Sequence, residues 1–357
     1  MGALISDGLS TDSITSASDM PVIDYQKLTG RANERKEALR LLDKSFQAYG
    51  FIYLLNHSIP QEMVDEAFAW CKRFFSLDHS VKSLVAHPAS GAVDDHRGFA
   101  KEGLGLVSQL IFDEAKVADL RLTSPERKET LEMGNPYPNK ESAPNRWLPE
   151  DALPGMRAFC ERWWDACTAL EKSMLRILGE ALELDDSELL YRKQRRDLCH
   201  MSWNYYPSMP IGPLKSRQLR RLNAHSDFGC LTLLFQDGVG GLEVHDGHVF
   251  RPVVPKRGTV VINVADMLER QTNGRWKSAL HQVVAPRESM MQKGFEPVSA
   301  VIDRYSLVYF GLPDPEVIID TLPGREQRGK WDPNMKGDWG TEITAAEWLQ
   351  KRLALEY

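Results

Sequence analysis

Residues 223–236 read NAHSDFGCLTLLFQ, and this stretch carries the strongest structural signal in the chain. Its apolar second half, 230–236, is typical of a strand that is buried on both faces. His225 and Asp227 stand two residues apart just before that strand, and side chains at i and i+2 of an extended segment point to the same side. The stretch therefore predicts two polar side chains held together at the entrance of a buried strand.

A further histidine can join this pair. His281 follows in another segment with the pattern of a strand end. Two imidazoles and one carboxylate on one face leave other metal positions open, which is the ligand arrangement of non-haem Fe(II) oxygenases. We therefore predict that His225, Asp227 and His281 bind a catalytic metal. Other histidines near these segments are expected to be turn or core residues: His200, His245 and His248.

The two halves of the chain differ in their hydrophobic period. The first half repeats apolar residues at helical spacing, whereas the second half contains short strands broken by turns, as in sandwiches and barrels. We predict helices over 34–49, 61–77, 156–184 and 345–355, and strands over 21–24, 51–55, 230–236, 258–263 and 306–310. A hairpin is expected over 242–250, with a type I′ turn at Asp246-Gly247. Residues 86–149 are expected to form loops. The predicted fold class is α+β.

Composition excludes several classes of protein. The 357 residues carry 44 Lys and Arg against 50 Asp and Glu, a net charge of −6, which argues against a strongly basic nucleic-acid binder. No apolar run approaches the roughly 18 residues that a membrane span needs. The five cysteines are odd in number and irregularly spaced, so a disulfide framework is not expected. We expect a cytoplasmic protein without nucleic-acid or membrane partners.

Two more strand segments carry polar side chains at i and i+2. Arg304 and Ser306 combine a guanidinium with a hydroxyl, which together suit a carboxylate. Asn204 and Tyr206 supply an amide and a phenol in the same way. Each pair alone is weak evidence, but their order around the histidines and Asp227 is specific.

These segments together resemble the iron(II)/2-oxoglutarate-dependent dioxygenases of the isopenicillin N synthase-like group, which include plant and fungal secondary-metabolite oxygenases. The resemblance covers nearly the whole chain after residue 20. The segments that carry it are PVID at 21–24, GFIYLLNH at 50–57, HRGF at 96–99, NYYP at 204–207, NAHSDFGCLTLLFQD at 223–237, GLEVHDGHVFRPV at 241–253, GTVVINVADMLERQTNGRWKSALHQVV at 258–284 and DRYSLVYF at 303–310.

The resemblance implies a double-stranded β-helix, or jelly-roll, core with an N-terminal mostly helical region and a C-terminal helix. It implies a disordered arm at 1–19, the helical region at 20–195, the jelly-roll domain at 196–320 and a helical extension at 321–357. A segment at 288–303 looks inserted relative to plant members and could be either a surface hairpin or a lid.

The resemblance also implies roles for single residues. Fe(II) would bind His225, Asp227 and His281, and O₂ and 2-oxoglutarate would be co-substrates, with ascorbate keeping the iron reduced. The distal carboxylate of 2-oxoglutarate would bind Arg304 and Ser306. A hydroxyl from Tyr206 would join that carboxylate site, and Asn204 would lie near the iron-chelating end.

The substrate is expected to be a small apolar or aromatic molecule. Its candidate contacts are Arg97, Phe99, Leu106, Phe228 and Phe310. The basic run Lys215, Arg217, Arg220 and Arg221 is expected to be a solvated loop, or else to attract an acidic substrate. Two other functions stay open at this point: an iron oxidase of the same fold that does not use 2-oxoglutarate, and a jelly-roll protein that only binds a small molecule.

Overall fold

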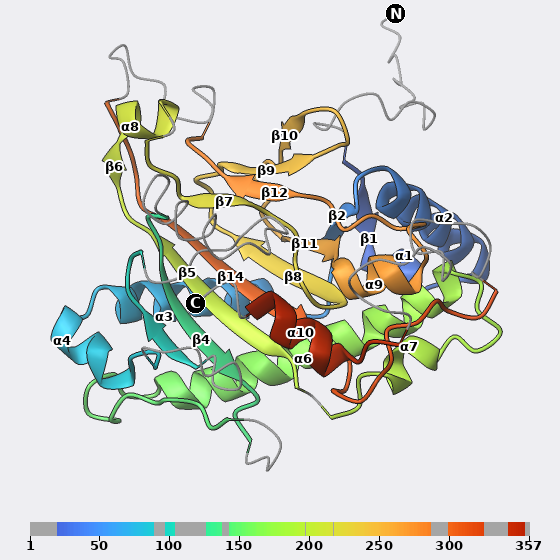
Figure 1. Ribbon diagram of the computed structural model, residues 1–357, viewed down its shortest axis with the longest axis horizontal. Coiled ribbons are helices and arrows are strands. Elements are labelled where there is room, and N and C mark those ends of the chain that lie inside the picture. Colours follow the sequence, from blue (N-terminus) through green and yellow to red (C-terminus); the bar gives the residue numbers. More distant parts are fainter. Residues whose placement is uncertain are drawn as a thin grey trace, which may run out of the picture.

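Two β-sheets face each other, with helices on the outside of the larger one (Figure 1). The computed structural model describes residues 20–88, 97–103, 126–137, 143–196, 198–216, 218–286, 299–324 and 342–353. The predicted arm at 1–19, most of the predicted insert and Leu106 lie outside the described residues.

The large sheet has eight strands in the order β1-β2-β11-β8-β14-β5-β4-β3, and the small sheet has the order β10-β9-β12-β7. A third, two-stranded sheet joins β13 to β6. The strands are β1 (Val22–Asp24), β2 (Phe51–Leu55), β3 (Gly98–Ala100), β4 (Glu129–Gly134), β5 (His200–Tyr206), β6 (Met209–Pro210), β7 (Leu222–His225), β8 (Leu231–Gln236), β9 (Leu242–His245), β10 (Phe250–Pro252), β11 (Thr259–Val264), β12 (His281–Val283), β13 (Ala300–Val301) and β14 (Arg304–Gly311).

The long helices pack on the large sheet, on the side away from the small sheet (Figure 1). The longest is α6 (Met156–Ala181), whose apolar stripe at three- and four-residue steps includes Phe159, Leu170 and Met174, all fully buried. The other helices are α1 (Tyr25–Leu28), α2 (Ala32–Ala48), α3 (Gln61–Phe75), α4 (His79–Lys82), α7 (Leu189–Arg192), α8 (Ile211–Lys215), α9 (Asp266–Gln271) and α10 (Ala345–Leu353), with a 3₁₀ turn η2 (Ser83–Val85).

A second cluster of apolar side chains fills one part of the space between the two sheets. Tyr206, Leu234 and Val261 contribute from the large sheet, and Leu242 and Val244 contribute from β9. The alternation of strand side chains explains both clusters, because even-numbered residues of β14 face the small sheet while Leu307 and Tyr309 enter the helical core. The polar residues at 304 and 306 are therefore interior residues of the barrel.

The helix and strand predictions agree with the structure to within a few residues at most ends. The prediction of loops over 86–149 is wrong at residues 98–100 and 129–134, which form strands. These strands, β3 and β4, extend the edge of the large sheet beyond β5. The sequence of β4, ETLEMG, alternates polar and apolar residues only from Thr130 to Met133, and this short run lies in a segment rich in Gly, Pro and Asn.

The hairpin between β9 and β10 also differs in its turn. His245 pairs with Phe250, so four residues form the loop rather than the two of a type I′ turn. The Asp246 carboxylate accepts hydrogen bonds from the backbone N–H groups of His248 and Val249. These bonds and the Arg251 guanidinium keep the pKa of Asp246 below its ordinary value.

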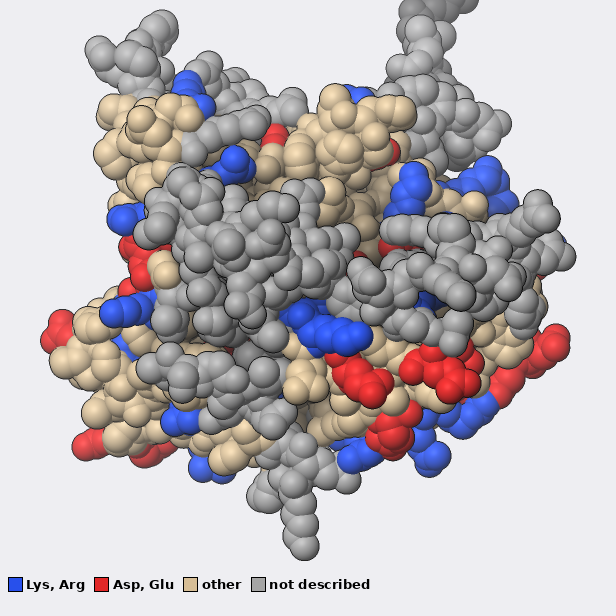
Figure 2. Space-filling view, in the orientation of Figure 1, with Lys and Arg blue, Asp and Glu red and all other residues tan. Residues whose placement is uncertain are grey.

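The face shown in Figure 2 carries acidic and basic side chains intermixed. None of the helices in the described ranges combines the length and apolarity that a bilayer crossing demands.

Candidate metal centre and its surroundings

Strand pairing brings the three predicted metal ligands together. His225 ends β7 and His281 begins β12, and the two residues are direct partners in the small sheet. Asp227 follows two residues after His225, and one ligand atom from each side chain lies within 4.8 Å of the others. All three residues are buried, at 6–7% exposure. Among the described residues, these three form the one group of histidine, cysteine or carboxylate side chains that is close enough together to hold a metal ion.

Backbone carbonyl groups set the tautomers of both histidines. The Nδ1–H of His225 donates to the Asn223 carbonyl at 2.9 Å, and that of His281 donates to the Ala279 carbonyl at 3.2 Å. Each Nε2 atom is then left as the lone-pair donor, and each lies close to Asp227 Oδ1, at 3.7 and 3.5 Å. Such outer contacts orient imidazole ligands in metal sites. The arrangement fits a divalent metal ion bound by two nitrogen atoms and one oxygen atom.

The Asp227 carboxylate is held by two neighbouring strands of the large sheet. Its Oδ2 accepts hydrogen bonds from Thr232 Oγ1 at 2.6 Å, on β8, and from Asn263 Nδ2 at 2.7 Å, on β11. Thr232 and Asn263 are themselves paired residues of the sheet. The other oxygen, Oδ1, is thereby left facing the histidines.

Electrostatics keep the Asp227 carboxylate of this cluster charged. Burial, with a smaller effect from His281, lowers the pKa of His225 to about 3, so this imidazole is neutral. Burial acts to raise the pKa of Asp227, but the histidines and Thr232 outweigh it and keep that pKa below its ordinary value. Burial likewise acts to lower the pKa of His281, and the Asp227 charge reverses this effect. A cation bound here would therefore meet a charged carboxylate already in place.

The C-terminal helix locks the loop that carries Asp227. Arg352 of α10 donates from Nη2 to the Ser226 carbonyl at 3.3 Å, and its Nη1 lies 3.3 Å from Asp266 Oδ2. Its guanidinium also lies 4.3 Å from the ring centroid of Phe228. The Asp266 N–H donates to the Asp227 carbonyl at 2.9 Å. In Figure 1, α10 lies over the end of β14 and β8, where it can make these contacts.

The predicted carboxylate anchor lies on the inner face of the large sheet. Arg304 pairs with Tyr206 and Ser306 pairs with Asn204, across β14 and β5. All four are at most 5% exposed. Arg304 Nη1 donates to Ser306 Oγ at 3.4 Å, and its guanidinium lies 4.9 Å from the centre of the Tyr206 ring. The structure thus brings the four residues together on one wall.

A single row of paired residues leads from the metal centre across this wall. It runs from Asn263 on β11 through Thr232, Phe310 and His200 to Gly134 on β4. Strands lie about 4.8 Å apart, so His200 is about 10 Å from the Thr232 that holds Asp227. Phe310 stands between them, with its ring centroid 6.2 Å from that of His200.

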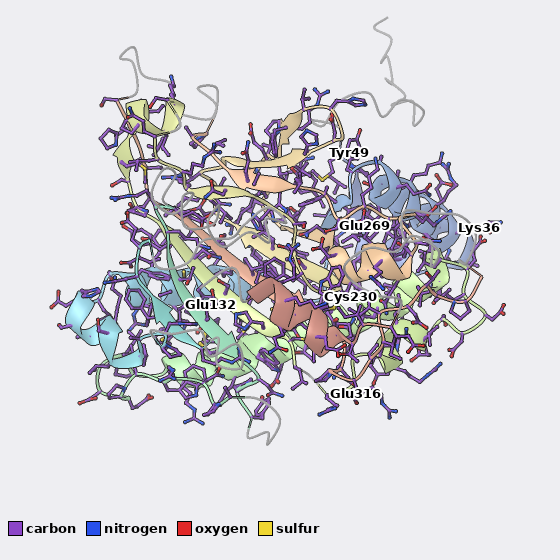
Figure 3. The ribbon with its side chains drawn as sticks, viewed as in Figure 1. Lys36, Tyr49, Glu132, Cys230, Glu269 and Glu316 are labelled. Carbon is purple, nitrogen blue, oxygen red and sulfur yellow. The ribbon has the colours of Figure 1, made fainter. Side chains whose placement is uncertain are left out.

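A buried network of polar side chains occupies the far end of this row. Glu132 Oε2 accepts from His200 Nε2, and Glu132 Oε1 accepts from Ser202 Oγ at 2.9 Å. Arg97 Nη1 donates to His200 Nδ1 at 2.8 Å, which places the imidazole proton on Nε2. Figure 3 labels Glu132 beside β4. The sequence indicated His200 only as a hydrogen-bonded residue, and it did not indicate Glu132 at all.

Charge within this network is well defined. Burial acts to raise the pKa of Glu132, but His200 and Ser202 outweigh it and leave that pKa below its ordinary value. Burial is also the main reason that the pKa of His200 is lowered, although Glu132 opposes it. Glu132 is therefore a carboxylate that hydrogen-bonds to a neutral imidazole.

The other predicted substrate contacts divide between the two faces of the sheet. Phe228 and Phe310 are half-buried, and Phe310 belongs to the row described above. Phe99 instead enters the helical core, with its ring 6.1 Å from that of Phe74, because it alternates with Gly98 and Ala100 on β3. It is therefore not retained among the substrate contacts.

Removal of one predicted ligand should strongly weaken metal binding without unfolding the chain. We expect His281→Ala to weaken Fe(II) affinity by more than the roughly 10–100-fold that changes next to a ligand typically cause. His245→Ala, on the neighbouring strand β9, is the matched control and should bind Fe(II) normally. Anaerobic calorimetry measures the affinity and circular dichroism checks the fold. Unchanged affinity in His281→Ala would remove this residue from the site.

The two residues that hold Asp227 should tune metal affinity. Thr232→Val and Asn263→Ala each remove one donor to Oδ2, so each should raise the Fe(II) dissociation constant by about 10–100-fold. Thr259→Val is the control, because the Thr259 hydroxyl donates to the carbonyl of Lys256, just before β11, and not to Asp227. Equal affinities in all three variants would show that the carboxylate needs no such support.

Comparison with known proteins agrees with this geometry. Residues 20–150 match the family described as the N-terminal part of non-haem dioxygenases in morphine synthesis, and residues 198–313 match the 2OG-Fe(II) oxygenase superfamily. The chain is 40% identical over 349 residues to the 2-oxoglutarate-dependent dioxygenase lolO1 of Epichloe uncinata, covering 95% of this chain and 94% of that one.

Two further relatives extend the comparison. The proline hydroxylase buaE of Petromyces alliaceus is 34% identical, over 94% of this chain and 98% of its own length. A Neurospora crassa protein crystallised with alpha-ketoglutarate (2-oxoglutarate) and thymine has a TM-score of 0.79 at 28% identity, covering 94% of this chain and 96% of that one. Together with the jelly roll and the His-Asp-His cluster, these findings place the chain in the 2-oxoglutarate- and Fe(II)-dependent oxygenase superfamily, as a dioxygenase that uses Fe(II), 2-oxoglutarate and O₂.

Proposed function

We propose that this dioxygenase oxidises a small organic molecule of secondary metabolism that carries a polar group beside an apolar or aromatic body. Hydroxylation, desaturation and ring rearrangement would use the same residues. The observation that carries the proposal is the buried network of Arg97, His200 and Glu132. Its His200 lies two strands away from Thr232, the residue that holds Asp227.

In this proposal, the bound metal and 2-oxoglutarate supply the O₂-dependent oxidation of a C–H bond. The chain's own residues divide the remaining tasks. His225, Asp227 and His281 hold the metal ion on one side, while Arg304, Ser306 and Tyr206 bind the distal carboxylate of the co-substrate. Asn204 lies between this anchor and Ser202, whose hydroxyl is 3.3 Å from Asn204 Oδ1.

The network suits recognition of a polar group for two reasons. A buried carboxylate is costly unless its hydrogen bonds are satisfied, so its presence on the inner face of the sheet restricts what can lie against it. A site built around such groups discriminates strongly against analogues that cannot complete the hydrogen bonds. Phe310 provides an apolar contact between the network and the metal centre, so polar and apolar parts of one molecule would be placed in a fixed order.

Two of the relatives support a compact substrate with polar groups. One is named as a proline hydroxylase, and another was crystallised with thymine. Both proline and thymine are small rings with hydrogen-bonding groups. Both molecules can therefore be used to test which polar groups the network binds.

The position of Arg97 depends on a glycine. Its guanidinium lies against Gly134, where a Cβ atom would come within 2.1 Å of Nη2. A side chain at residue 134 would therefore displace Arg97 from His200. Gly134→Ala thus perturbs the network without altering any of its hydrogen-bonding groups.

Loss of the Glu132 charge should impair substrate binding while co-substrate binding is preserved. We expect Glu132→Gln to raise the substrate KM by about tenfold or more, the cost of one charge-assisted hydrogen bond. Substrate-stimulated succinate formation is measured over compact rings with amide, amine or carboxyl groups, including thymine and L-proline, and over matched hydrocarbons. Gly134→Ala should act in the same direction.

The control is Glu243→Gln, on β9 in the small sheet, where the carboxylate bonds to Gln282. This variant should keep the wild-type KM, and all variants should bind 2-oxoglutarate with the wild-type dissociation constant. Turnover of a matched hydrocarbon with an unchanged KM in Glu132→Gln would refute the proposed substrate class.

A further inference from the structure

A second buried arginine lies next to the predicted carboxylate anchor. Arg221 belongs to the basic run that the sequence indicated as a solvated loop, yet it is 0% exposed. It directly precedes β7. Its Nη2 donates to the carbonyl groups of Ile302 and, at 3.4 Å, Pro207. The expectation of a solvated side chain is therefore wrong for this residue.

The two carbonyl groups place Arg221 close to the anchor. Pro207 directly follows Tyr206, and Ile302 comes two residues before Arg304. Tyr206 and Arg304 are paired across β5 and β14, so Arg221 closes this end of the strand pair. Its guanidinium thus connects the end of β5 to the start of β14.

Both arginines keep N–H groups without a partner. Nε and Nη1 of Arg221 and Nε of Arg304 are buried and make no hydrogen bond. Within the part of the chain that the structure describes, neither guanidinium makes an ion pair.

The acidic groups nearby are occupied by other donors. The carboxylate of Asp237 accepts from the backbone N–H groups of Tyr305, at 2.6 Å, and Val239, at 3.0 Å. Asp303 accepts from the Ser208 N–H at 2.6 Å and from the Tyr205 hydroxyl at 3.2 Å. The buried positive charge of the two arginines is therefore not matched by a hydrogen-bonded carboxylate of the protein.

Two adjacent guanidinium groups buried without an anion are unfavourable, because each loses hydration and repels the other. Burial and the charge of Arg304 lower the pKa of Arg221 to about 10, which is the physical sign of this cost. An anion bound between the strand ends would relieve it and would supply acceptors for the free N–H groups.

We propose that Arg221 is a second arginine of the co-substrate site, which together with Arg304 binds the C5 carboxylate of 2-oxoglutarate. Its bonds to the Pro207 and Ile302 carbonyls hold Tyr206 and Arg304 at that site. Its charge makes the site selective for 2-oxo acids that have a second carboxylate. One residue of the basic run, Arg221, is thus buried and would bind the co-substrate instead of facing solvent.

The test compares two 2-oxo acids of equal chain length on the Fe(II)-loaded protein without oxygen. One is 2-oxoglutarate, and the other is 2-oxopentanoate, which has no distal carboxylate. Arg221→Met removes the charge, and Arg220→Met, at the neighbouring half-buried residue, is the matched control. Calorimetry gives both dissociation constants, with 2-oxopentanoate measured by competition.

We expect Arg221→Met to weaken 2-oxoglutarate binding by about thirtyfold, which corresponds to one charge-assisted hydrogen bond. Binding of 2-oxopentanoate should change by less than about threefold, because the lost interaction involves only the distal carboxylate. Arg221→Lys should recover part of the selectivity, since it keeps the charge but lacks the planar fork. Arg220→Met should retain wild-type selectivity.

A purely structural role for Arg221 gives a different pattern. It would weaken both acids equally, or lower the melting temperature without changing either dissociation constant, and either result would overturn the proposal. If Arg221→Met does not fold, Arg221→Gln replaces it, because an amide keeps a donor for the two carbonyl groups without the charge. The same loss of selectivity is expected from that variant.

Discussion

The antiparallel pairing of β12 with β7 is the constraint on which the metal centre depends. It sets His281 opposite His225, and a shift by one residue would turn one imidazole to the other face of the sheet. The Asp227 carboxylate must then meet this pair from the loop after β7. Thr232 and Asn263 hold it there from the opposite sheet, so the centre joins both sheets of the jelly roll. Metal binding is thus built into the packing of the two sheets.

The same alternation of side chains divides the inner wall of the large sheet into regions. Next to Thr232 and Asn263 lies the metal centre. Ser306 and Arg304, the predicted carboxylate anchor, follow four and six residues along β14 from Phe310, the partner of Thr232. The network around His200 lies on β4 and β5, close to the β3 edge of the sheet. The predicted anchor and the network both use residues two apart on β5, so one face of this strand carries parts of both groups. The helices behind this wall and α10 at its end keep the strands in position.

Local sequence patterns predicted the parts of this arrangement that depend on residues two apart in one segment of the chain. The pairs His225 and Asp227, Arg304 and Ser306 belong to this class, and the structure brings both pairs to the interior. Contacts between distant strands leave no local pattern, which is why Thr232 and Arg352 were not assigned roles. The alternation of β4 spans only Thr130 to Met133, too few residues to predict a strand within a segment rich in Gly, Pro and Asn. Arg221 has the sequence environment of a solvated charge, and only the strand ends that enclose it make it buried.

We propose that the two sheets of the jelly roll hold Fe(II) and 2-oxoglutarate in contact with each other. Anaerobic titration of the Fe(II)-loaded protein with 2-oxoglutarate, followed by visible absorption, measures this contact. We expect a metal-to-ligand charge-transfer band that saturates at one 2-oxoglutarate per chain. Tight Fe(II) binding without any such band would contradict it, because the co-substrate would then not reach the metal that His225, Asp227 and His281 hold.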